Sequence, residues 1–244
     1  MASFDRESDI FKRLGLIPSE KVCPLTNSES EIELFESFKK HDLWIDNSND
    51  TNDPPDYYNN ADGYMMDFMR TNDYEIHKRN GKVVNNIAAA ENRMVKEIEA
   101  SGILDLLPNI SKENIICVPK DDIKPSFTKY YNNIERVLED HNKQTDNYRK
   151  NHPNCKLIFC VCDLSEHEHI IRRVNPDGKL IDDIVYNPCF DNSVLHIIKE
   201  LDVDFVVWYR PWLMPTTDSP QLVIIDVHKL DADGFFDLKE IQNE

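Results

Sequence analysis

The sequence predicts a single α/β domain over residues 1–244, with a mixed central sheet flanked by helices. The order of segments favours this class, and the composition provides for its core. From residue 114 onward, short apolar segments alternate with segments of helical periodicity, as they do in layered α/β folds. Hydrophobic residues make up 40% of the chain and aromatic residues 9%, which is enough for a sizeable core. No internal repeat and no linker divides the sequence into two domains.

The amino-terminal half contains clear signals for helices, strands and turns. Ser28 and Glu31 form a capping box ahead of an apolar stripe, which predicts that a helix begins at residue 29. The apolar run that ends at Met69 is too short for a helix and predicts a strand. Gly102 provides the C-cap of a second helix. The expected elements are a helix at 29–41, a short strand from Trp44, a polar loop at 46–62, a strand at 64–69, a turn at 79–82 and a helix at 86–100.

The carboxyl-terminal half is dominated by one long helix. Pro125 and Ser126 mark its start, and apolar side chains from Phe127 to His141 recur at helical spacing. The strands are short apolar segments bounded by turn residues. The expected elements are strands at 114–119, 156–163, 204–209 and 221–228, helices at 127–149 and 192–201, and a turn at 175–178.

The chain is strongly acidic, and its charge is unevenly distributed. The formal net charge is −17 at pH 7. Residues 42–75 hold nine acids against a single base, Arg70. Nucleic-acid affinity comes largely from neutralising phosphates, so this field disfavours a nucleic-acid partner unless metal ions or a local basic face offset it. Solubility, a divalent-metal site or a basic protein partner each accounts for the acidic segment.

Several common functions lack their sequence signal. The six glycines form no dinucleotide-binding or P-loop motif, and no Gly-x-Ser-x-Gly elbow occurs. No apolar run is long enough to span a membrane, and the amino terminus is charged where a signal peptide would be apolar, so a cytoplasmic location is expected. The six cysteines include no Cys-x-x-Cys pair, which predicts reduced thiols.

Two aspartates eleven residues apart are the strongest catalytic candidates. Asp56 follows a proline, and Asp67 lies within the apolar strand at 64–69. This order of helix, Pro-Asp and acid-bearing strand resembles the PD-(D/E)XK nuclease-like superfamily. The resemblance implies a restriction-endonuclease-like core at about 29–118 and an α/β continuation at about 119–244. It also implies that both aspartates hold a magnesium ion that activates water for phosphodiester hydrolysis.

The chain departs from this family at the position of the motif lysine. Met69 occupies that position, and strand alternation places Arg70 on the opposite face from Asp67 and Met69. The family's usual cation is therefore missing from the expected site.

A third carboxylate is expected on the helix at 86–100. At 100° per residue, Glu91 projects within about 60° of Ile87 and Met94, inside the apolar stripe. Burying an ionised carboxylate there is costly without a partner. Some nuclease-like families place an acidic residue on this helix, so the resemblance adds Glu91 to the catalytic and metal-binding set. Alternatively, Glu91 reaches solvent or a structural arginine.

Cysteine and histidine residues raise the question of a zinc site. Cys160 and Cys162 precede a Glu-His-Glu-His run at 166–169, and these residue types bind metals. A buried strand followed by a solvated loop accounts for the same pattern more simply, because free cysteine behaves as a small hydrophobe.

Strand ends and one aromatic loop are further candidates. Asp163 and Asp226 end apolar strands, where open α/β sheets bind ligands and where aspartates also serve as routine caps. The loop at 208–212 carries residue types that are enriched at binding hot spots, although it could equally pack against a helix.

The resemblance thus implies a metal-dependent nuclease-like protein, or a catalytically degenerate relative of one, with magnesium as its cofactor. The alternative is a non-enzymatic acidic module that binds a basic or nucleic-acid-handling protein. That module would use residues 42–75 and the loop at 208–212.

Overall fold

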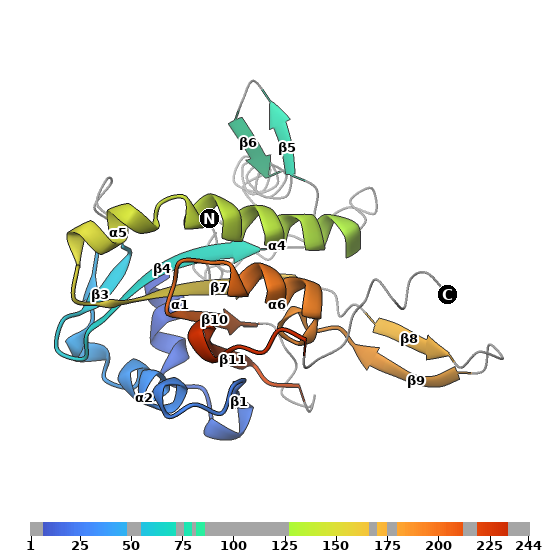
Figure 1. Cartoon of the computed structure of the whole chain (residues 1–244), viewed down its shortest axis with the longest axis horizontal. Helices are drawn as coiled ribbons and strands as arrows, with labels where there is room; N and C mark the ends of the chain where they lie inside the picture. Colours follow the sequence, from blue (N-terminus) through green and yellow to red (C-terminus); the bar gives the residue numbers. More distant parts are fainter. Residues whose placement is uncertain are drawn as a thin grey trace, which may run out of the picture.

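The structure is a computed structural model of the chain, and it describes residues 7–47, 55–71, 76–79, 82–85, 127–165, 170–174, 180–211 and 219–233. Within these residues the fold is α/β, with a seven-stranded mixed sheet and helices on both of its faces (Figure 1). The predicted class is therefore confirmed. The restriction-endonuclease-like arrangement of the amino-terminal half stays a prediction.

The central sheet is built around three parallel strands. The strand order is β1-β11-β10-β7-β4-β3-β2, and β4, β7 and β10 all run in the same direction. The outer strands β3 and β11 run antiparallel to their central neighbours, and β1 runs parallel to β11. The carboxyl ends of the three central strands therefore lie along one edge. The strand bounds are β1 Val22–Pro24, β2 Ile45–Asp46, β3 Tyr57–Asn59, β4 Tyr64–Thr71, β7 Lys156–Asp163, β10 Phe205–Tyr209 and β11 Leu222–Asp226.

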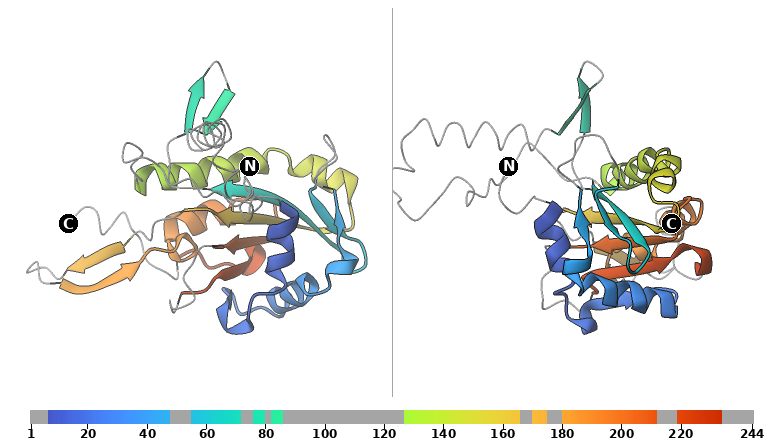
Figure 2. Two further views of the ribbon diagram at one scale, coloured as in Figure 1. Left: turned by 180° about the vertical axis from the view of Figure 1, so that it is seen from behind. Right: turned by 90° about the vertical axis from the view of Figure 1, so that its left-hand side faces the viewer.

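Helices cover both faces of the sheet (Figure 2). One face carries α4, α5 and α6, which belong to the crossovers between the parallel strands. The other face carries α1 and α2. The α-helix bounds are α1 Glu7–Leu14, α2 Glu29–Phe38, α4 Phe127–Asn142, α5 Thr145–Asn151 and α6 Asn192–Lys199, and short 3-10 turns are η2 Ser19–Lys21, η3 His41–Leu43, η6 Pro188–Phe190 and η7 Val227–Lys229.

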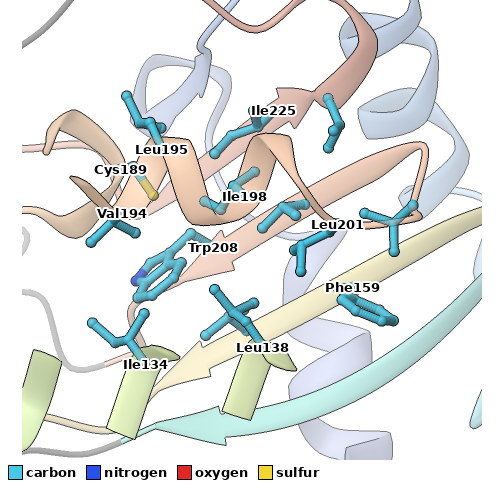
Figure 3. Close-up of a cluster of buried hydrophobic side chains, with 14 of the residues drawn as sticks. Ile134, Leu138, Phe159, Cys189, Val194, Leu195, Ile198, Leu201, Trp208 and Ile225 are labelled. Atoms are coloured by element: carbon cyan, nitrogen blue, oxygen red, sulfur yellow. The ribbon is translucent and has the colours of Figure 1, made fainter. Parts of the chain in front are cut away.

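Strand alternation divides the apolar side chains into two cores. Phe159 and Trp208 face α4 and α6, and Figure 3 shows Trp208 between Ile134 of α4 and Val194 of α6. Their sequence neighbours on β7 and β10 face the α1 and α2 layer instead. Because both faces are covered, the central strands are apolar at nearly every position rather than at every second one.

Two hairpins project from the body of the molecule in Figure 1. The first pairs β5 (Ile76–Arg79) with β6 (Lys82–Asn85) up to Arg79 and Lys82, the two ends of the turn predicted at 79–82, whose central residues 80–81 lie outside the described ranges. The second pairs β8 (Ile170–Val174) with β9 (Leu180–Val185) on either side of the turn predicted at 175–178. The residues of that turn lie outside the described ranges, as do the predicted helix at 86–100 and the predicted strand at 114–119.

The prediction of one continuous helix at 127–149 is wrong, because the chain forms two helices with a break at residues 143–144. In a continuous helix Tyr148 would project about 80° away from Leu138. The break instead allows Tyr148 to reach the sheet, where its hydroxyl donates a hydrogen bond to Asp67.

The polar loop predicted at 46–62 contains the strand β3, so that expectation is also wrong for residues 57–59. Tyr57 and Asn59 are buried there, and the asparagine-rich composition of the segment conceals this alternation. The helix α1 was not predicted. None of the helices in the described ranges is long and apolar enough to cross a membrane.

A buried glutamate connects α2 to the sheet strand β11. The capping box predicted at Ser28 and Glu31 is confirmed. The Glu31 side chain is fully buried, and it accepts hydrogen bonds from the backbone N–H groups of Thr26, Ser28 and Asp226 at 2.9 to 3.2 Å. One carboxylate therefore satisfies donors on both the helix entry and β11.

We expect Glu31→Ala to lower the free energy of unfolding by about 3 to 5 kcal/mol, because three backbone donors lose their buried acceptor. Urea denaturation measures this change. Glu33→Ala is the matched control on the same helix, since Glu33 is exposed and its removal should cost no more than about 0.5 kcal/mol. Equal effects of the two substitutions would show that Glu31 does not tie the helix to the sheet.

Candidate functional site

The hairpin of β3 and β4 brings the two predicted aspartates opposite each other. Tyr57 pairs with Met66 in the antiparallel register. Asp56 immediately precedes Tyr57 and Asp67 follows Met66, so the next cross-strand position holds Asp56 and Asp67. Beyond Asp67, β4 continues to Thr71 with no β3 residue paired to it. The two aspartates therefore lie where the pairing of the two strands ends.

Asp67 lies on the sheet face covered by α4 and α5. Its neighbours on that face of β4 are Met65 and Met69, which belong to the apolar core. The Oδ2 atom of Asp67 contacts Nδ1 of His141 at 2.5 Å and accepts a hydrogen bond from the Tyr148 hydroxyl at 2.9 Å. Asp67 is buried, and these two partners offset the cost of burying its charge.

Asp56 continues the ladder between β3 and β4 with its side chain. Its Oδ2 atom accepts the backbone N–H of Phe68 at 2.7 Å. The carboxylate thus takes the place of a backbone carbonyl at the point where β3 begins. The Asp56 side chain is half-buried at this end of the hairpin.

The charges of Asp67 and Asp56 raise the pKa values of the two helix side chains at the site, His141 and Tyr148. Partial burial lowers the pKa of His141, but the Asp67 hydrogen bond and the charges of Asp67 and Asp56 outweigh it and raise this pKa above the ordinary value. Burial, followed by the charge and hydrogen bond of Asp67, raises the pKa of Tyr148. His141 is therefore cationic at higher pH than a free imidazole, and Tyr148 remains a neutral donor.

The exposed side of the site is formed by His141. Its side chain is 32% exposed, whereas that of Asp67 is 7% exposed. Asp67 engages Nδ1, and in the part of the chain that the structure describes Nε2 has no hydrogen-bond partner. The ring nitrogen opposite Asp67 is thus the atom that can meet a substrate.

The outcome for the other predicted site positions is mixed. Met69 lies on the same face as Asp67 and is 2% exposed, while its neighbour Phe68 faces the opposite core, as strand alternation predicts. Glu91 lies outside the described residues. Within the described ranges, no group of three or more histidine, cysteine or acidic side chains is arranged to hold a metal ion.

Sequence reasoning missed His141 and Tyr148 as members of this site. The available signal was a histidine within the apolar stripe of a helix, together with an aspartate within an apolar strand. Both residue types need a partner when they are buried, so each predicts the other. Neither the helix pattern nor the strand pattern shows which residue of the helix lies opposite which residue of the strand.

The remaining candidates from the sequence, where the structure describes them, are buried or hydrogen-bonded within the fold. Cys160 and Cys162 are fully buried on the α1 and α2 face, and burial raises the pKa of the Cys160 thiol, whereas the neighbouring run at 166–169 lies outside the described residues. Asp226 accepts a hydrogen bond from the Ser30 hydroxyl at 2.5 Å. In the loop at 208–212, Trp208 is buried in the core.

No family model, curated protein or solved structure matches this chain significantly. The chemistry of the site therefore follows from its own residues. A histidine whose Nδ1 is held by a carboxylate can donate or accept a proton at Nε2. Two carboxylates at one hairpin can also contribute oxygen ligands to a divalent cation.

We expect the stabilisation contributed by His141 to depend on pH. Its folded-state pKa is raised above the unfolded value of about 6.5, so the contribution is fully present below about pH 6.5 and is lost as the pH rises through the folded-state pKa. His141→Gln should therefore cost more stability at about pH 6 than at about pH 9, which chemical denaturation at both pH values measures.

His196→Gln is the control for that comparison. The His196–Asp233 pair is 2.8 Å long, but its side chains are 55% and 80% exposed, and surface pairs contribute little. Its variant should leave the stability nearly unchanged at both pH values. A cost of His141→Gln that does not change with pH would contradict the assigned role of Asp67.

Proposed function

We propose that this chain is a nuclease-like hydrolase of low activity, with its site at Asp56, Asp67 and His141. The observation that carries the proposal is the convergence of two hairpin carboxylates on one imidazole, Asp67 through a hydrogen bond and Asp56 through its charge. A helix-borne cation beside two strand-borne acids provides the charges needed for phosphodiester hydrolysis.

Magnesium fits the donor types at this hairpin. Asp56 and Asp67 would hold the ion through carboxylate oxygens, and magnesium is commonly bound by one or two carboxylates together with substrate phosphates. The bound ion would stabilise charge on the phosphate and lower the pKa of water. The hydrogen bonds that Asp67 already makes to His141 and Tyr148 orient its carboxylate and limit the number of oxygen lone pairs left for a ligand.

His141 would supply the cation that Met69 does not. The raised pKa keeps the imidazole protonated to higher pH than a free imidazole, and its Nε2 atom is the one directed away from Asp67. This nitrogen would donate a proton to the leaving oxygen or stabilise negative charge on the phosphate. A histidine loses its proton at lower pH than a lysine does, so catalysis is expected to be weaker than with a lysine.

We expect slow cleavage of single-stranded or duplex DNA or RNA in the presence of magnesium or manganese. Asp67→Asn and His141→Gln should each reduce the rate at least about tenfold, because they remove a ligand or its supporting group. Asp146→Asn is the matched control, since it makes the same charge change at an exposed position of α5. Circular dichroism would confirm that each variant is folded. Cleavage that Asp67→Asn leaves intact, or no cleavage by the wild type, would contradict the proposal.

The second candidate function is that of an acidic module that binds a basic protein. It is favoured by exposed apolar side chains on α2 and β2, where Ile32 is 54% exposed and Ile45 is 48% exposed. The exposed polar side chains of α2 and β2 are acidic, and they are Glu29, Glu33, Glu36 and Asp46. Apolar groups beside acids are complementary to an amphipathic segment rich in lysine and leucine.

A binding experiment in chelator separates the two functions. At about 0.15 M salt we expect no measurable binding to a DNA duplex, because the −17 charge opposes phosphates when no metal is present. A synthetic amphipathic lysine–leucine peptide should bind if the acidic module is correct, and Ile32→Ser should weaken that binding. Tight DNA binding in chelator would instead require a basic groove and would remove the support for the acidic module.

A further inference from the structure

Three polar residues form a row at the carboxyl ends of the central strands. Thr71 ends β4 and pairs in register with Asp163, which ends β7. Cys162 pairs with Tyr209 at the end of β10, so Arg210 occupies the next position beside Asp163. Strand alternation places all three side chains on the face of α4 and α6. The row lies apart from the Asp67 site, which is in the middle of β4.

The Asp163 carboxylate in this row is saturated by donors from the protein. Its Oδ2 atom accepts hydrogen bonds from the Tyr130 hydroxyl and from Nε1 of Trp208, the latter at 3.2 Å. Its Oδ1 atom accepts the backbone N–H and the hydroxyl of Ser165 at 3.0 and 2.7 Å. Asp163 therefore needs no further partner, and the nearest guanidinium nitrogen, Nε of Arg210, is 3.8 Å away.

The two outer members of the row have unsatisfied donors. Arg210 is 7% exposed and Thr71 is 2% exposed. In the part of the chain that the structure describes, neither Nη1 of Arg210 nor Oγ1 of Thr71 has a hydrogen-bond partner. A buried polar group without a partner costs about 1 to 3 kcal/mol, and more when it is charged. Such groups are rare in folded proteins and indicate a missing ligand or water.

A third donor of the same kind lies on the segment before α6. Asn187 is 4% exposed, and its Nδ2 atom also lacks a partner among the described residues. This segment adjoins the row. The ring of Tyr186 packs edge-on, at 6.3 Å between ring centroids, against Tyr130, whose hydroxyl donates to Asp163. The charges of Asp163 and Arg210 also both act on the thiol of Cys189.

We propose that Thr71 and Arg210 bind the oxyanion of a small molecule, a phosphate or a carboxylate, at the carboxyl edge of β4, β7 and β10. Unsatisfied donors together with a guanidinium select an anionic, oxygen-rich group. The carboxyl edge of parallel strands is where open α/β sheets bind ligands. The acidic surface of the protein opposes long polyanions, so the ligand is a small molecule rather than a nucleic-acid strand.

The test titrates inorganic phosphate and, separately, succinate into the whole chain at constant ionic strength, with calorimetry and thermal unfolding as readouts. Replacing Arg210 would leave the Asp163 carboxylate without its nearby cation, so the variant used is Thr71→Val, which has nearly the same shape. We expect saturable binding of at least one probe to the wild type. Binding to Thr71→Val should be about tenfold weaker, the effect of losing one hydrogen bond to a charged group.

Thr26→Val is the matched control. Its hydroxyl also has no partner among the described residues, but it lies between β1 and α2, away from the row. Phosphate stabilises most proteins non-specifically, and a comparison of the two variants at equal concentration removes that effect. Thr71→Val should not lower the melting temperature without ligand, because the deleted hydroxyl makes no hydrogen bond.

Saturation by phosphate or by succinate would identify which oxyanion the site takes. Three outcomes would overturn the proposal. They are the absence of saturable binding by either probe, which would mean that only water meets these donors, equal binding by Thr71→Val and the wild type, and equal weakening by Thr26→Val.

Discussion

The parallel pairing of β7 with a strand on each side is the constraint on which the rest of the structure depends. Parallel strands cannot be joined by a tight turn, so the chain must cross over a sheet face between β4 and β7 and again between β7 and β10. Both crossovers place their helices on the same face. The opposite face is then left for α1 and α2, which come from the amino-terminal part of the chain.

A polar side chain has no access to solvent when its strand is covered on both faces and paired with a strand on each side. Each acid that enters this layered core is consequently matched by donors from a distant segment. Glu31, Asp67, Asp163 and Asp226 are all 5% exposed or less, and their donors include the Asp226 backbone, His141, Trp208 and the Ser30 hydroxyl respectively. These buried carboxylates fix the register between layers, since apolar contacts alone have little directionality.

The sequence contained the information for the elements whose signals are local. The bounds of β7 and the capping box of α2 were predicted correctly, because an apolar run and a Ser-x-x-Glu pattern need no knowledge of the rest of the fold. The break between α4 and α5 was not predictable from periodicity, since it depends on where Tyr148 must point in space.

The same distinction applies to the candidate site. The hairpin spacing of Asp56 and Asp67 is local, and the sequence singled out both residues. Their helix-borne partner His141 lies 74 positions from Asp67 along the chain, so only the packing of α4 on the sheet brings them together. The sequence also singled out Asp163 and the loop that contains Arg210, but only the pairing of β10 with β7 places the two residues side by side.

The pairing of β1 with β11 has a consequence for the way the chain folds during synthesis. Residues 22–24 find their strand partner only at residues 222–224, and Glu31 meets the Asp226 backbone 195 positions later. The amino-terminal layer therefore lacks its strand partner, and Glu31 lacks its donor from β11, until nearly the whole described chain has left the ribosome. Such high contact order slows folding, and it leaves the apolar face of the newly made amino-terminal segment exposed until the sheet is complete.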